Sequence, residues 1–149
     1  MSAPDVQVRL LCPDDLEAVA ALEAACFSRP WSADALARTF SLPAARFFVA
    51  EEAGEILGYV GMLAVLDEGQ ILNIATAPHA RGKGVASALL SALFAAEKEL
   101  TFYTLEVRES NTPARRLYEK FGFLTDGRRR GYYTDPTEDA ILMTKKVTV

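Results

Sequence analysis

Two clusters of residues in this sequence have the types and the spacing that chemistry requires. The first is a pair of glycines around a lysine, within Arg81-Gly82-Lys83-Gly84, between an apolar segment and an apolar pattern of helical period. Glycine lets a loop turn its backbone N–H groups toward one point, and the start of a helix adds unpaired N–H donors and the positive end of the helix dipole. The pattern predicts a strand, a phosphate-binding loop and a helix.

The second cluster is an acidic residue in an apolar strand, followed by a tyrosine on the next helix. Glu106 shares one face of this predicted strand with Thr104, whereas residues 103, 105 and 107 face the other way. A carboxylate is costly to bury, so Glu106 is expected to meet water or a partner, or to line a cleft. Tyr118 could place its ring in the core and its hydroxyl in a site. Both are candidates for proton transfer; the alternatives are a solvated strand acid and a core ring.

The elements that must position these clusters follow from hydrophobic periodicity and turn residues. Strands are predicted at residues 6–11, 46–52, 56–66, 70–76, 101–107, 123–130 and 140–147, and helices from Pro13 and at residues 33–40, 83–100 and 111–121. In the first helix, Glu23 is an acidic exception at an apolar position. Short turns at 52–55 and 67–69 predict that the three middle strands form an antiparallel meander. The order is β-α-α-β-β-β-α-β-α-β-β.

Composition limits the classes of function that are possible. The 149 residues, half of them hydrophobic and 24% charged, suit one globular domain with one core. No apolar run is long enough to cross a bilayer and residues 1–5 lack the pattern of a signal peptide, so no membrane partner and a cytoplasmic location are expected. Two cysteines and one histidine without ligand spacing predict no metal site. The net charge of −4 argues against direct nucleic-acid binding and permits a cationic partner.

Two familiar phosphate loops do not fit the glycine pair. The P-loop needs four residues between its glycines and Ser or Thr after the lysine, and the dinucleotide fingerprint needs a third glycine where Ser87 stands. Instead, residues 81–86, Arg-Gly-Lys-Gly-Val-Ala, resemble the Arg/Gln-x-x-Gly-x-Gly/Ala signature of the GCN5-related N-acetyltransferases (GNAT), whose loop holds the pyrophosphate of coenzyme A. This resemblance implies acetyl-CoA as cosubstrate and an α/β (α+β) GNAT fold, a mixed, mostly antiparallel seven-stranded sheet with about four helices.

The resemblance also implies which residues contact the cosubstrate. They are Ile74, Ala75, Thr76, Arg81, Gly82, Lys83, Gly84, Val85, Ala86, Ser87 and Asn111. Asn111 is expected to contact the pantetheine or to order its turn, and the alternative is a helix cap alone.

Motifs along the whole chain resemble the RimI-type ribosomal-protein-alanine N-acetyltransferases within that family. These motifs are Phe27-Ser28-Arg29-Pro30-Trp31-Ser32, Glu106-Val107-Arg108-Glu109-Ser110-Asn111, Leu117-Tyr118-Glu119, Gly122-Phe123 and Arg130-Gly131-Tyr132-Tyr133. The resemblance implies that Glu106 is the general base, that Tyr118 protonates the departing thiolate, and that a backbone N–H of residues 74–76 holds the oxyanion. The implied acceptor is the N-terminal alanine of a basic small-subunit ribosomal protein. Trp31, Tyr132 and Tyr133 are expected to form the wall of its site; the alternatives are an anchor for a helix N-terminus and packing within a hairpin.

Other functions are consistent with the same motifs. An acetyltransferase of the same fold could act on a small-molecule amine or on another protein's N-terminus. A non-catalytic acyl-CoA sensor would keep the glycine loop but could dispense with Glu106 and Tyr118, so the presence of both favours catalysis. The run of arginines at residues 128–130 is interpreted as solvated surface, and a monomer or weak dimer is expected.

Overall fold

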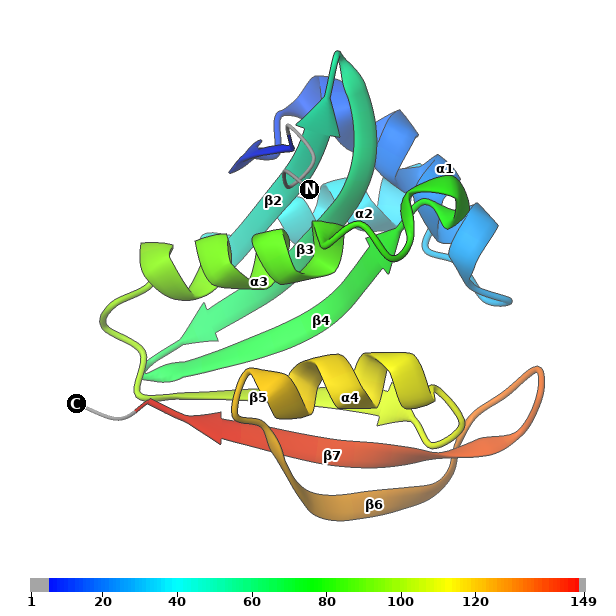
Figure 1. Cartoon of the computed structure of the whole chain (residues 1–149), viewed down its shortest axis with the longest axis vertical. Coiled ribbons are helices and arrows are strands. Elements are labelled where there is room, and N and C mark those ends of the chain that lie inside the picture. Colours follow the sequence, from blue (N-terminus) through cyan, green and yellow to red (C-terminus); the bar gives the residue numbers. More distant parts are fainter. Residues whose placement is uncertain (1–5, 148–149) are drawn as a thin grey trace.

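The computed structural model describes residues 6–147, and these form one seven-stranded sheet with helices on both faces (Figure 1). The strands are β1 (Gln7–Leu10), β2 (Ala45–Glu52), β3 (Glu55–Val65), β4 (Glu68–Thr76), β5 (Phe102–Arg108), β6 (Leu124–Tyr133) and β7 (Glu138–Lys146). The α-helices are α1 (Leu16–Cys26), α2 (Ala33–Phe40), α3 (Val85–Ala96) and α4 (Thr112–Lys120), and short 3₁₀ helices lie at Pro13–Asp15 and Pro78–Ala80. Residues 1–5, on which the expectation about a signal peptide rests, lie outside the described residues.

The two faces of the sheet carry different helices. In Figure 1, α3 and α4 lie in front of the sheet, and α1 and α2 lie behind it. Adjacent residues of β3 show the same division, because successive strand residues point to opposite faces. A Cβ at Gly58 would lie 2.9 Å from Val85 of α3, whereas Tyr59 donates a hydrogen bond to Glu23 of α1. Side chains of the middle strands are therefore buried on both faces.

The strand order is β1-β2-β3-β4-β5-β7-β6, and β4–β5 is the parallel pair in a sheet whose other neighbours are antiparallel. This order confirms both the mixed, mostly antiparallel sheet and the predicted meander of β2, β3 and β4. Pairing between β4 and β5 runs only from Glu68 with Phe102 to Gln70 with Thr104. Beyond these residues the two strands diverge (Figure 1), and this gap lies at the centre of the sheet.

Several boundaries differ from the sequence-based predictions. β6 runs to Tyr133 rather than to residue 130, and β7 begins at Glu138 rather than at residue 140. Gly69 lies inside β4 rather than in the turn before it. A Cβ at this position would meet Tyr103 at 2.6 Å and Met62 at 2.7 Å. The glycine thus permits close packing, and the turn falls at Leu66 and Asp67. The helix predicted over 83–100 ends at Ala96. Across residues 6–147, none of the helices is both long and apolar enough to cross a membrane.

Candidate active site

The glycine loop turns directly into α3. Gly82 and Gly84 have φ angles of +80° and +82°, a left-handed conformation that other residues adopt at a cost. Gly84 is the N-cap residue of α3, and its carbonyl accepts a hydrogen bond from Ala88 N–H at 3.0 Å. The N–H groups of the first turn have no partner within the helix. A Cβ at either glycine would meet nothing within 4 Å, so the positive φ rather than crowding favours glycine here. Free N–H groups at a helix start suit an anionic group such as a pyrophosphate.

The outer edge of β4 supplies a second set of backbone donors. Ala77 N–H donates to Leu57 of β3 at 2.8 Å, whereas the Thr76 carbonyl accepts from the Cys26 thiol at 3.3 Å. Successive residues of a strand direct their polar backbone groups to alternate sides. The N–H groups of Ile74 and Thr76 therefore point away from β3, into the gap that opens where β5 diverges. Ala75, between them, is buried.

Glu106 lies on the face of β5 opposite to α3 and α4. Its neighbours Leu105 and Val107 are buried, and its own side chain is 30% exposed. Arg129 of β6 places Nε 2.6 Å from Glu106 Oε2, so this buried oxygen is held in an ion pair. A carboxylate beside the gap is the type of group that can accept a proton there.

Two tyrosines at the end of β6 surround this carboxylate. The rings of Tyr132 and Tyr133 pack edge to face, with centroids 5.1 Å apart. Arg129 lies over Tyr132 and Arg108 lies over Tyr133, at 5.5 and 4.6 Å. Burial, and then the charge of Glu106, raise the pKa of Tyr133 to about 12, and the same two causes raise the pKa of Tyr132. Both phenols therefore stay neutral beside the carboxylate.

Tyr118 approaches β5 from the other face. Its ring lies 5.7 Å from that of Phe123, which in turn lies 6.2 Å from Phe94 of α3. Only 5% of Tyr118 is exposed, and burial raises the pKa of its hydroxyl well above the ordinary range. The structure thus sets Glu106 and Tyr118 on opposite faces of β5, and the phenol remains protonated.

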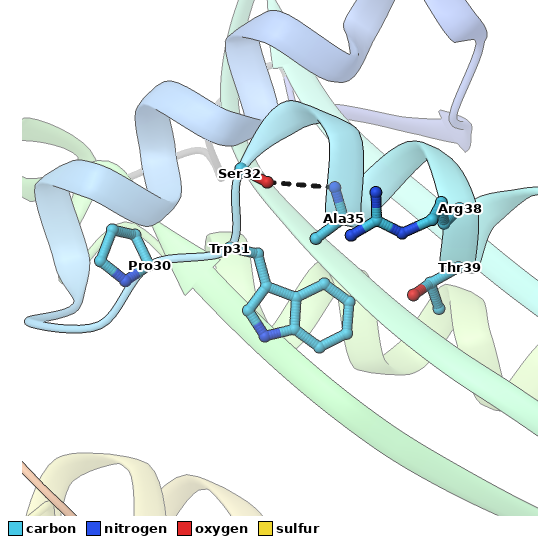
Figure 2. A pocket seen from close by; sticks show the side chains of 6 residues that line it. All are labelled: Pro30, Trp31, Ser32, Ala35, Arg38 and Thr39. Carbon is cyan, nitrogen blue, oxygen red and sulfur yellow. Dashed lines mark hydrogen bonds between the residues drawn. The ribbon is translucent and has the colours of Figure 1, made fainter.

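Trp31 lies on the α1 and α2 face, in the loop before α2. The open pocket beside it has a volume of about 430 Å³ and is lined by Pro30, Trp31, Ser32, Ala35, Arg38 and Thr39 (Figure 2). Ser32 caps α2 by accepting a hydrogen bond from Ala35 N–H at 3.1 Å. Within the described residues, no aromatic contact joins Trp31 to Tyr132 or Tyr133; its backbone N–H donates a hydrogen bond to Glu23 of α1 at 2.9 Å.

The remaining candidates have structural partners. Asn111 is the N-cap residue of α4 and accepts a hydrogen bond from Ala114 N–H at 3.3 Å. This contact is the one expected if Asn111 serves as a helix cap. In the arginine run, Arg128 pairs with Glu109 and Asp139, and Arg129 pairs with Glu106. All three arginines are exposed, as predicted for solvated surface. Arg128 and Arg129 nevertheless form ion pairs with carboxylates. Within the described residues, no group of three or more His, Cys, Asp or Glu side chains is placed to hold a metal ion.

Sequence reasoning assigned no role to two residues that the structure places beside these candidates. One is Arg129, considered only as part of the run. The other is Glu23, which is fully buried and accepts hydrogen bonds from three separate elements. Its signal in the sequence was an acidic residue at an apolar position of a helical pattern.

Comparison with known proteins identifies the family. The profile of the acetyltransferase (GNAT) family matches residues 16–123. A Bacillus subtilis (strain 168) protein, provisionally named a ribosomal protein bS18-alanine N-acetyltransferase, is 39% identical over 139 residues, which cover 91% of this chain and 92% of the relative. The Escherichia coli (strain K12) ribosomal protein bS18-alanine N-acetyltransferase is 33% identical over 139 residues, covering 91% of this chain and 93% of the relative.

Solved structures agree with this result. The crystal structure of the ribosomal-protein-S18-alanine N-acetyltransferase from Escherichia coli superposes with a TM-score of 0.90 at 32% identity, covering 97% of this chain and 95% of that one. The glycine loop before α3, the diverging β4 and β5 and the matched sequence lead to one conclusion. The chain belongs to the acetyltransferase (GNAT) family and is an N-acetyltransferase that uses acetyl-CoA.

Proposed function

We propose that the chain acetylates the α-amine of the N-terminal alanine of a ribosomal protein, by direct attack of the amine on acetyl-CoA in a ternary complex. The names of the relatives at 39% and 33% identity support the acceptor. The observation that carries the mechanism is the position of two ionisable groups on opposite faces of β5, Glu106 on one and Tyr118 on the other. An amine and a thioester can then meet in the gap between β4 and β5 from opposite sides of the sheet.

The cosubstrate side is the face that carries α3 and α4. The N–H groups of residues 82–87, with the positive end of the α3 dipole, would hold the pyrophosphate, and the side chains of Arg81 and Lys83 add positive charge. Ile74, Ala75 and Thr76 would run beside the pantetheine, and Asn111 would order the turn that faces it. Acetyl-CoA supplies an activated thioester.

Proton transfer is divided between the two faces. An N-terminal amine has a pKa of about 8 and is already partly neutral at pH 7, so a carboxylate that accepts one proton is a sufficient base. Glu106 takes this proton as the C–N bond forms. The N–H groups of Ile74 and Thr76 donate to the oxygen of the reacting carbonyl, where negative charge develops. Tyr118 gives its proton to the sulfur as the C–S bond breaks.

The acceptor side is the face that carries α1 and α2. Trp31, Tyr132 and Tyr133 would contact the first residues of the acceptor, with the two tyrosines next to Glu106. The net charge of −4 favours approach of a basic N-terminal region.

The test is intact-mass analysis after incubation with acetyl-CoA and a basic peptide that begins Ala-Arg. The expected result is the gain of one acetyl group on the α-amine. The matched control is the same peptide with a blocked N-terminus and an internal lysine, which should stay unmodified. A polyamine panel tests the alternative acceptor class. Acetylation of the polyamines or of the lysine, with the free N-terminus untouched, would contradict the N-terminal proposal and leave the family assignment intact.

A further inference from the structure

The carboxylate of Glu23 is the most deeply buried charged group in the described residues, and the mechanism above does not use it. Its side chain has no exposed surface. Oε1 accepts the backbone N–H of Trp31 at 2.9 Å, and Oε2 accepts the Tyr59 hydroxyl at 2.5 Å and Asn73 Nδ2 at 2.6 Å. Burying a carboxylate is costly unless its hydrogen-bond partners compensate for the lost hydration. A carboxylate at this helix position therefore needs a reason other than packing.

The three donors come from three different elements. Tyr59 belongs to β3, where burial and the nearby carboxylate raise the pKa of its hydroxyl and keep it a donor. Trp31 belongs to the loop between α1 and α2, beside the pocket of Figure 2. Asn73 belongs to β4, directly before the Ile74–Thr76 edge. One carboxylate thus joins the loop on the acceptor side to the strand that carries the proposed oxyanion donors.

A β-bulge in β4 makes the contact with Asn73 possible. Ile71 pairs with Met62 and Asn73 pairs with Gly61, so Leu72 is the extra residue. A bulge reverses which face the following side chains occupy. Because of it, Asn73 shares the α1 face with Tyr59, as the hydrogen bonds of both residues to Glu23 confirm. The bulge therefore places the Asn73 side chain where Glu23 can accept its hydrogen bond.

We infer that Glu23 is a positioning residue for the acceptor: it holds the Trp31 loop at a fixed distance from the bulged segment of β4. The inference rests on the proposed function, because that function places the acceptor between this loop and the β4 edge. Glu23 touches no reacting atom and transfers no proton. Loss of the link frees the loop, so acceptor binding weakens while the glycine loop, on the other face, still holds acetyl-CoA.

Three variants separate this role from a general contribution to stability. Asn73→Ala removes the donor from β4, and Glu23→Gln retains the size of the side chain but cannot accept from all three donors. Tyr59→Phe is the matched control, because it removes one donor to the same carboxylate without breaking the link between Trp31 and Asn73. If Glu23→Gln fails to fold, Asn73→Ala still tests the link, since Asn73 is only half-buried.

The first readout needs no turnover, because Trp31 is the only tryptophan of the chain. Acrylamide quenching of its fluorescence in the free protein should increase in Asn73→Ala and Glu23→Gln but not in Tyr59→Phe. Unchanged quenching in both variants would overturn the inference, whichever acceptor the enzyme proves to use. Failure of the proposed function is seen separately, as absence of α-amine acetylation in the wild type.

The second readout is steady-state kinetics with the acceptor peptide. Losing a hydrogen bond to a buried charge should raise the KM for the peptide by about tenfold. The KM for acetyl-CoA should change by less than about twofold. Equal increases of both KM values, or the same increases in Tyr59→Phe, would show a structural role only and would overturn the inference.

Discussion

Arg129 of β6 places its Nε 2.6 Å from Oε2 of Glu106 on β5, although β7 lies between the two strands. The guanidinium also lies over the ring of Tyr132. A cation therefore already pairs with the carboxylate that the proposed mechanism uses as the base for the acceptor amine. The Arg129 side chain is 59% exposed, so it can leave this position at a modest cost.

The first prediction concerns Arg129→Gln. An exposed ion pair is worth about 1 kcal/mol or less, so removing the competing cation should lower the KM for the acceptor peptide by up to about fivefold. The KM for acetyl-CoA should not change. Steady-state kinetics measure both values, and Arg130→Gln is the control for the loss of one positive charge on the same strand. A fall in kcat with no change in the peptide KM would instead show that Arg129 orients Glu106.

Replacement of Glu106 tests the base. Glu106→Gln keeps the shape of the side chain but cannot take a proton, so kcat should fall by about 10²- to 10⁴-fold. Calorimetric binding of acetyl-CoA should be retained. Glu109→Gln is the matched control, because Glu109 is an exposed carboxylate that pairs with Arg128 just beyond the end of β5. Unchanged turnover in Glu106→Gln would remove this residue from the mechanism.

The pH dependence of kcat tests Tyr118. Burial disfavours the phenolate and raises the pKa of Tyr118, so the hydroxyl should remain a proton donor up to at least pH ~10, the ordinary tyrosine range. No fall in kcat that depends on Tyr118 is expected below that pH. Tyr118→Phe should lower kcat by about 10²- to 10⁴-fold without changing the shape of the profile.

The control for this variant is Tyr103→Phe. Tyr103 is also a buried tyrosine, and it donates to the Glu97 carbonyl at 3.1 Å, so its loss should lower stability rather than kcat. A descending limb below about pH 10 in the wild type that disappears in Tyr118→Phe would contradict the stated protonation of Tyr118.

The order of the elements could be predicted because it depends on local patterns. Residues 33–40 are predicted as a helix, and α2 has these bounds; the Ser32 hydroxyl caps it by accepting from Ala35 N–H. The bulge at Leu72 and the divergence of β4 from β5 depend on pairing with distant strands. No local pattern marks where such pairing stops. Gly69 was assigned to a turn for the same reason, as the side chains that require it come from β3 and β5.

In the candidate site, too, features marked by local patterns could be predicted, whereas contacts between distant residues could not. Glu106 and Tyr118 could be proposed as candidates because an acid in an apolar strand and a family motif are visible in the sequence. The hydrogen bonds of Glu23 could not be deduced, because Tyr59 and Asn73 lie 36 and 50 residues away along the chain. A buried carboxylate is recognised only by its partners. The pair of Arg129 and Glu106 likewise depends on β7 lying between two strands that do not pair with each other.

The last prediction tests the glycine loop against an equivalent glycine elsewhere. Gly84 and Gly54 have φ angles of +82° and +83°, and a Cβ at either position would meet nothing within 4 Å. Alanine should therefore cost a similar free energy of unfolding at both sites, about 1–2 kcal/mol, as measured by denaturant titration. Gly84 begins α3, whereas Gly54 lies in the turn between β2 and β3.

The two variants should differ in acetyl-CoA binding. A left-handed residue at the start of α3 directs the first N–H groups toward the proposed pyrophosphate, so Gly84→Ala should weaken calorimetric binding of acetyl-CoA by about tenfold or more. Gly54→Ala should bind acetyl-CoA as the wild type does, despite its equal loss of stability. Equal affinities in the two variants would mean that the cosubstrate does not depend on the conformation of this loop.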